Sequence, residues 1–396
     1  MPRGTRLALS GSEVKSRFNA TVFAGTAVLS ICLLSSAQAP ARQQGSARTE
    51  PARAFTFTTF EAPGSGTGAQ QGTVPFSINA AGSVAGTYYD ASNAYHGFVR
   101  DATGTMTTFE APGSGTGASQ GTFPFSINTP GEITGPYVDA SNAYHGFLRG
   151  AKGKIITFEV PGSGTGTHQG TVPVGINATG AVAGMYFDAN NVCRGFVRAA
   201  NGTINTFAAP GAGSGSSQGT FPIGINAAGV IAGLYRDASN LYHGFERAVT
   251  GKIIAFEAPG SGTAKGQGTF AVSISPAGNI VGMYRDASNV YHGFERGAGR
   301  KIITFEAPGA GTHELQGSMP FGINPAGDIA GFYIDTNYAF HGMVRSASGS
   351  VTTFEAPGAG KGMMQGTVSF SINPAGAVAG TYIDSSYVYH GFVGMP

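Results

Sequence analysis

The amino-acid sequence predicts an all-β protein, specifically a seven-bladed β-propeller of four-stranded antiparallel blades whose ring is closed by its first strand. Three observations lead to this fold: a glycine-rich composition with little charge, a 49-residue repeat, and four strand signals in every copy of the repeat. Internal repeats of about 20–50 residues are typical of solenoids, propellers and arrays.

The composition favours a glycine-punctuated β protein. The 396 residues include 64 Gly and 21 Pro but no Trp, and 11% of them are charged. Ordinary soluble domains contain about 25% charged residues. This balance excludes helical bundles and coiled coils, which are rich in Ala, Glu, Lys, Leu and Arg, and it excludes charge-rich disordered chains.

The first 39 residues have the layout of a secretory signal peptide. Basic residues precede an apolar run over 21–34, and small residues follow up to Ala39, so that cleavage after Ala37 or Ala39 fits the pattern. The apolar run is shorter than the roughly 20 residues that an uncleaved membrane anchor needs. Residues 40–53 are polar and rich in Pro, Ala and Arg, which is typical of a flexible linker. We therefore expect a bacterial protein that is exported to the periplasm or the extracellular space.

The part of the chain after the signal has almost no net charge. It contains 19 basic and 20 acidic residues, spread evenly along the sequence. Such a distribution gives no electrostatic attraction for nucleic acid or for an anionic membrane, so we expect neither as a partner. Cys193 is the one cysteine beyond the signal, which excludes an intramolecular disulfide. We expect a monomer without a cofactor.

From Ala54 to Pro396 the sequence consists of seven units of 49 residues without insertion or deletion. A histidine recurs at the same position of six units, and Arg194 takes its place in the remaining one. An aspartate lies six residues before each of these positions in all seven units. The histidines are His96, His145, His243, His292, His341 and His390, and the aspartates are Asp90, Asp139, Asp188, Asp237, Asp286, Asp335 and Asp384.

Each unit carries four strand signals bounded by turn residues. In unit 103–151 these are Thr105–Glu110, Phe123–Asn128, Glu132–Asp139 and Ala143–Arg149, and a long Gly/Ser connector follows the first. Short turns predict antiparallel neighbours, so the TFE strand is outermost and the FSIN strand lines the channel. The chain starts with a lone outer strand and ends one strand short, so its two ends complete one blade. A linear solenoid, the alternative, gives no reason for this split phase.

The segment 77–100, SINAAGSVAGTYYDASNAYHGFVR, resembles the HAF repeats of predicted extracellular bacterial proteins. The triplets at 175–177, 224–226 and 322–324 match the Gly-Ile-Asn opening of that repeat most closely, and His-Gly-Phe stands where the family has His-Ala-Phe. The resemblance covers the chain from Ala54 onward. It implies a repetitive exported β protein and carries no activity, because the family itself is uncharacterised.

Three catalytic or metal-binding interpretations of the repeated polar residues are weak. Asp90, Ser92 and His96 recur within seven residues, but Asp and Ser share one tight turn, whereas a hydrolase triad places His between the acid and the nucleophile. Equivalent histidines on neighbouring blades are too far apart for a zinc site, and each Asp turn offers one carboxylate where calcium takes six to eight oxygens. We expect Asp and His to be structural, with the His ring wedged between blades and bonded to a neighbouring turn such as that of Asp90, and we expect no metal and no catalytic residue.

A glutamine precedes the inner strand in every unit. These side chains either bond a neighbouring connector or form a ring of amides that binds sugar hydroxyls or peptide. As candidate ligand-binding residues we name Gln71, Gln120, Gln169, Gln218, Gln267, Gln316 and Gln365, together with His168 and His313, which depart from the repeat in the connectors.

The sequence thus predicts a secreted, non-enzymatic propeller that binds a glycan or protein partner through the face bearing the long connectors. The first alternative is a hydrolase or lyase acting at the channel, which rests on analogy between propeller folds. The second is a purely structural surface protein, favoured by the near identity of the units.

Overall fold

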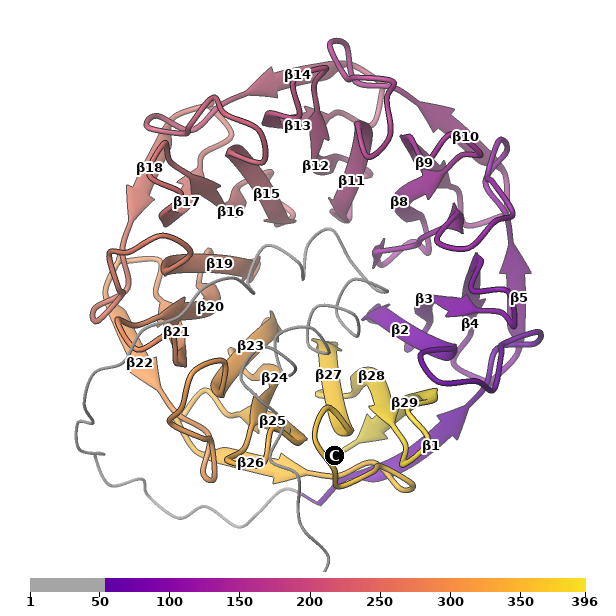
Figure 1. Cartoon of the computed structure of the whole chain (residues 1–396), viewed down its shortest axis with the longest axis vertical. Helices are drawn as coiled ribbons and strands as arrows, with labels where there is room; N and C mark the ends of the chain where they lie inside the picture. The colour runs from indigo at the N-terminus through magenta and orange to yellow at the C-terminus, as the bar shows by residue number, and fades with distance from the viewer. Residues whose placement is uncertain (1–53) are drawn as a thin grey trace, which may run out of the picture.

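The computed structural model describes residues 54–396, so the expected signal peptide and linker lie outside the described residues. The described part is an all-β closed ring, with no helix among its elements. Figure 1 shows the groups of strands arranged radially around the centre of the ring, with the chain running once around it. Within these residues no helix is present that is long and apolar enough to cross a membrane.

Each group of strands has four positions, which run from the centre of the ring to its rim. The innermost strands are β2 (Gly72–Ile78), β6 (Gly121–Thr122) with β7 (Ser126–Ile127), β11 (Gly170–Ile176), β15 (Gly219–Ile225), β19 (Gly268–Ile274), β23 (Gly317–Ile323) and β27 (Gly366–Ile372). The second strands are β3 (Val84–Tyr89), β8 (Ile133–Val138), β12 (Val182–Phe187), β16 (Ile231–Arg236), β20 (Ile280–Arg285), β24 (Ile329–Ile334) and β28 (Val378–Ile383).

The third and outermost strands complete each group. The third strands are β4 (Tyr95–Arg100), β9 (Tyr144–Arg149), β13 (Cys193–Arg198), β17 (Tyr242–Arg247), β21 (Tyr291–Arg296), β25 (Phe340–Arg345) and β29 (Tyr389–Met395). The outermost strands are β5 (Met106–Phe109), β10 (Ile155–Phe158), β14 (Ile204–Phe207), β18 (Ile253–Phe256), β22 (Ile302–Phe305), β26 (Val351–Phe354) and β1 (Thr56–Phe60). Within each group all neighbouring strands pair antiparallel, as β2–β3, β3–β4 and β4–β5 do.

The two ends of the chain meet in one group, as the split phase of the repeat predicted. The first strand, β1, pairs antiparallel with the last strand, β29, with Thr56 opposite Met395 and Phe60 opposite Gly391. Figure 1 shows β1 at the rim beside β29. The pairing leaves β29 without an open edge, and this explains why the ring closes without a special capping unit.

The inner strands carry a bulge whose extra residue packs in the central apolar cluster. In β2 the register shifts between Pro75 and Ser77, so Phe76 is the extra residue. The equivalents in the remaining groups are Phe125, Val174, Ile223, Val272, Phe321 and Phe370, all in or against this cluster. Phe76 lies 5.2 Å from Phe123 and 5.5 Å from Phe370 between ring centroids. The extra residues are therefore aromatic in four adjacent groups and aliphatic in the other three.

One inner strand is interrupted, for a local reason. Between β6 and β7 the backbone N–H groups of Phe123 and Phe125 still bond to carbonyls of the second strand, Pro136 O and Thr134 O. Pro136 itself stands on that second strand, and a proline has no N–H with which to complete the ladder. The four-position pattern is preserved although the strand is split.

Neighbouring groups are joined by a chain of asparagine amides that sequence reasoning did not anticipate. The Nδ2 group of Asn79 donates to Asn128 O at 3.0 Å, and Asn128 donates in the same way to Asn177 O. The link from Asn373 Nδ2 to Asn79 O joins the last group to the first. Ser275 replaces the asparagine at one position and lacks the amide. Each of these donors reaches the equivalent carbonyl of the next group, 49 residues onward except where the link from Asn373 returns to Asn79.

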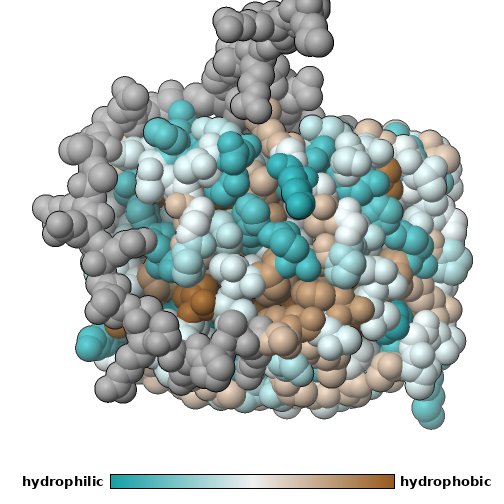
Figure 2. Space-filling model, turned by 90° about the horizontal axis from the view of Figure 1, so that it is seen from below, coloured by the Kyte–Doolittle hydropathy of each residue, from teal (hydrophilic) through white to brown (hydrophobic). Residues whose placement is uncertain are grey.

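The surface of the ring is mixed in character. On the side shown in Figure 2, hydrophilic residues gather toward one face of the ring and hydrophobic residues toward the other. Large exposed hydrophobic side chains are nevertheless few, namely Ile156, Val249, Ile303 and Met395.

Candidate functional site

The aspartate of each unit closes the turn between the second and third strands. Asp90 Oδ1 accepts the N–H groups of Ser92 and Ala94 at 2.8 and 2.9 Å, and also the hydroxyl of Ser92 at 2.7 Å. Burial raises the pKa of Asp90, but these hydrogen bonds outweigh it and hold the pKa below its ordinary value. Asp and Ser thus bond to each other within one turn.

In the six units that have it, the histidine lies between two carboxylates. His96 Nε2 is 3.3 Å from Asp90 Oδ2, the aspartate named from the sequence, and His96 Nδ1 is 2.6 Å from Glu110 Oε1. The ring also stacks on Tyr88, with centroids 4.7 Å apart and planes 19° from parallel. The aspartate and the tyrosine belong to the same group of strands as the histidine, so the ring is not itself the link to the neighbouring group.

The link between groups is the glutamate, which sequence reasoning missed as a partner of the histidine. The second oxygen of Glu110, Oε2, accepts the hydroxyl of Thr122 on the next inner strand at 2.6 Å. Thr122 Oγ1 in turn accepts the N–H of Ala111. The same glutamate recurs at the end of six outer strands: Glu61, Glu110, Glu159, Glu257, Glu306 and Glu355.

These carboxylates stabilise the protonated form of several histidines. Burial lowers the pKa of His292, but hydrogen bonds with Asp286 and Glu306 outweigh it and raise the pKa to about 9. The pKa values of His243, His341 and His390 are also raised, chiefly by the hydrogen bond with the glutamate. At neutral pH His292 is therefore an imidazolium that donates to both neighbours, as a structural ion pair does.

One group departs from this arrangement. In β11–β14 the histidine is replaced by Arg194, whose Nε lies 3.2 Å from Asp188 Oδ2, and the glutamate is replaced by Ala208. Cys193 stands where the other units have Tyr or Phe; it is buried, and burial raises its pKa well above the ordinary value. The arginine keeps the aspartate contact, and the position of the second carboxylate is vacant.

The glutamines hold the connectors in place. Gln120 Oε1 accepts the N–H of Gly117 at 3.0 Å, and its Nε2 donates to Ala140 O and to Asn142 Oδ1, both at 3.2 Å. Its backbone carbonyl accepts the N–H of Tyr95 in the preceding group. The acceptor contact recurs at all seven glutamines: Gln71, Gln120, Gln169, Gln218, Gln267, Gln316 and Gln365.

The glycine after each glutamine is required by the same junction. Gly121 has a φ of +121°, and a Cβ there would stand 1.9 Å from Tyr95 O of the preceding group. Only glycine permits this approach. The Gln-Gly pair therefore joins connector, inner strand and neighbouring group at one point.

The candidate ligand-binding residues differ in accessibility. Gln267, Gln316 and Gln365 are buried, and the remaining four glutamines are half-buried. His168 and His313 are exposed in the connectors, and the ring of His168 stacks on Tyr144 at 6.0 Å. The ligand-binding role of these residues stays a prediction. The geometry adds that every amide oxygen is already bonded within the protein, and so is every amide nitrogen except the buried Nε2 of Gln316, so a ligand would meet the connectors that the glutamines hold. Among residues 54–396 no cluster of three or more His, Cys, Asp or Glu side chains could hold a metal ion.

No protein-family model and no curated protein matches the chain. Among solved structures, it is similar to the BP39L lectin from Burkholderia pseudomallei, with a TM-score of 0.50 and 9% identity over 80% of this chain and 93% of the lectin. Puromycin hydrolase gives a TM-score of 0.49 at 11% identity over 78% of this chain, which spans 50% of the hydrolase. A six-bladed β-propeller lectin from Aleuria aurantia gives 0.39 at 13% identity, over 71% of this chain and 92% of the lectin. At these identities the likeness to the Burkholderia lectin extends to the fold alone, an all-β propeller-like ring.

Proposed function

We propose that this protein is a secreted, non-enzymatic propeller that binds a glycan through the connector face. The observation that carries the proposal is the repetition of one connector geometry around the ring. In the first connector Pro63, Gly64, Thr67 and Gly68 are exposed, and Gln71 Oε1 bonds the N–H of Gly68. Because the glutamine contact recurs in each connector, the ring presents many copies of one surface. Such an array suits a polymeric ligand with repeating sugars.

We also propose a number of blades, a signal peptide and a repeat type for this chain. We count each four-strand group as one blade and take β6 and β7 as one interrupted strand, which gives seven blades that match the seven 49-residue units. We assign residues 1–39 to a signal peptide and the units to HAF-like repeats. The Burkholderia protein of similar fold is a lectin by name, and this makes glycans the first ligand class to test.

The test is a glycan and polysaccharide binding screen run beside a panel of hydrolase and lyase substrates. If the connectors form equivalent weak sites, a polymer should bind about 10²–10⁴ times more tightly than its monomeric sugar. Replacing Gln169 and Gln218 together by Ala should loosen two connectors and weaken binding in part, because the other copies remain intact. Turnover of a substrate that one substitution abolishes would establish the hydrolase or lyase alternative. Absence of any binding would favour the structural surface protein.

A further inference from the structure

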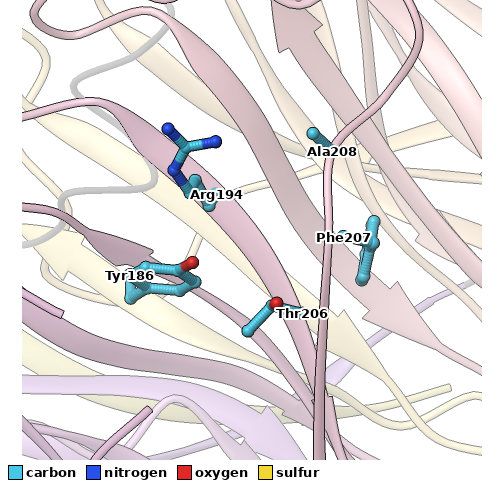
Figure 3. A pocket seen from close by; sticks show the side chains of 5 residues that line it. All are labelled: Tyr186, Arg194, Thr206, Phe207 and Ala208. Carbon is cyan, nitrogen blue, oxygen red and sulfur yellow. The ribbon is translucent and has the colours of Figure 1, made fainter. Parts of the chain in front are cut away.

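The vacant carboxylate position in the β11–β14 group forms a pocket. Its volume is about 290 Å³, and Tyr186, Arg194, Thr206, Phe207 and Ala208 line it. In Figure 3, Arg194 and Tyr186 lie on one side of the opening, and Thr206, Phe207 and Ala208 lie on the other. Tyr186, Thr206 and Phe207 match the repeat, so the pocket results from the change to arginine and alanine.

The other copies show what normally fills this position. In the neighbouring β15–β18 group the carboxylate of Glu257 occupies it: Oε1 lies 2.5 Å from His243 Nδ1, and Oε2 accepts the hydroxyl of Thr269 at 2.7 Å. A carboxylate at this place is thus bound from two sides by donors of the fold. Ala208 removes the carboxylate and leaves the rest of the arrangement in place.

The donors on both sides of the vacancy remain. Thr220, the counterpart of Thr269, is fully buried and accepts the N–H of Ala209 at 2.8 Å, but the glutamate that would accept a hydrogen bond from its hydroxyl is absent. Arg194 uses Nε for Asp188, and its side chain is 43% exposed. Its two terminal nitrogens contact no acceptor within residues 54–396. A guanidinium is permanently charged and matches the two oxygens of a carboxylate.

We propose that this pocket is a single subsite for the carboxylate of a uronic acid residue in an acidic glycan. The inference rests on the proposed glycan-binding function and adds a specificity to it. The ligand carboxylate replaces the missing glutamate and pairs with Arg194. The volume lies just below the range of about 300–1,000 Å³ for drug-sized ligands, which suits one sugar ring.

The experiment measures binding of trigalacturonic acid and of its methyl ester by titration calorimetry, at low and high salt. We expect one site per chain for the acid, weakened by salt, and at least tenfold weaker binding of the ester. The variant R194H/A208E restores the repeat and places the protein's own carboxylate in the pocket, so it should lose the site while its melting temperature is unchanged or higher. The variant H243R/E257A makes the opposite exchange in the neighbouring group and should raise the stoichiometry from one to two.

Equal binding of acid and ester, or full binding by R194H/A208E, would overturn the proposal. Binding of a glutamate-rich peptide without binding of trigalacturonic acid would also overturn it, in favour of an acidic protein partner. A neutral polymer that binds the wild type and R194H/A208E equally, together with no binding of trigalacturonic acid, would refute this subsite and leave the proposed function standing. Failure of every glycan would refute both. Circular dichroism of each variant shows whether a loss of binding follows from a loss of fold.

Discussion

The β11–β14 and β15–β18 groups are neighbours with the same backbone pattern and different charges at their outer edge. The first has Arg194 and Ala208 where the second has His243 and Glu257. Both keep the aspartate that caps the turn: Asp188 accepts the N–H of Val192, and Asp237 that of Leu241, at 3.0 and 2.9 Å. The comparison teaches that the turn and the strands do not depend on the glutamate. The glutamate adds a link to the next group, and where it is absent Arg194 is a donor that an external carboxylate can use.

The largest effect on stability is expected when a group loses its whole outer strand. Deleting residues 54–61 takes β1 from β29 and removes Glu61, the partner of His390 at 2.5 Å. We expect loss of cooperative unfolding, because the last group keeps three strands and an open edge. Thermal unfolding followed by circular dichroism measures this, and deletion of residues 40–52 serves as the control. Equal stability of the two truncated proteins would contradict closure by the first strand.

We expect a smaller loss of stability when the glutamate of one group is removed and the histidine of that group is kept. The variant E257A removes the carboxylate that accepts the hydroxyl of the fully buried Thr269, whose other hydroxyl partner is Ser261, and it leaves His243 with Asp237 alone. We expect a decrease in the free energy of unfolding of about 1–2 kcal/mol. Denaturant titration of E257A and of H243R/E257A measures it.

The double variant should recover part of the loss, because arginine pairs with Asp237 as Arg194 pairs with Asp188. If E257A is as stable as the wild type, the glutamate link contributes nothing to the fold, and the comparison between the two groups loses its energetic basis.

The comparison also predicts a pH dependence that only the histidine groups contribute. A pKa of about 9 for His292 in the folded protein exceeds the ordinary value of 6.5, so its stabilising contribution is complete below pH 6.5 and is lost as the pH rises through 9. His243, His341 and His390 shift in the same direction. We expect the melting temperature to fall by roughly 2–6 °C between pH 6.5 and 9.5.

Arg194, which replaces the histidine in the β11–β14 group, does not titrate in this range. The variant R194H/A208E adds one histidine between two carboxylates and should steepen the decrease in melting temperature with pH. A melting temperature that is constant or rises across this interval would show that the histidines are not stabilised as cations.

The fold could be predicted from the sequence to a large extent, because the repeat has one length throughout and its strand signals are local. The pairing of β1 with β29 followed from the phase of the two ends alone. The partners of His96 could be predicted only in part. Asp90 is six residues away and shares a turn with it, whereas Glu110 reaches His96 through the pairing of β4 with β5, and Thr122 belongs to the next group.

The sequence did contain a signal for the contact between histidine and glutamate that was not predicted. The single copy that has Arg194 in place of the histidine also has Ala208 in place of the glutamate. Two positions that change together in one repeat are expected to touch. The bond from an asparagine such as Asn79 to the equivalent carbonyl of the next group could not be predicted in the same way, because it depends on the angle between neighbouring groups.

The smallest effect concerns Cys193, the free cysteine of the described residues, which reports on opening of the group that holds Arg194. Its side chain is 1% exposed, its thiol donates to Thr220 O at 3.2 Å, and burial raises its pKa. Because the thiolate is the reactive form, we expect alkylation by iodoacetamide to be at least 100-fold slower in the native protein than in the urea-unfolded protein. Mass spectrometry of a protein without residues 1–39, which lacks Cys32, measures the rate. If the vacant carboxylate position loosens this group, R194H/A208E should slow the alkylation further, by a few-fold, because the restored glutamate again bonds Thr220. Faster alkylation of that variant would show that the β11–β14 group opens less often in the wild type, with Arg194 and Ala208, than in R194H/A208E. The absence of the glutamate would then cost this group no local stability.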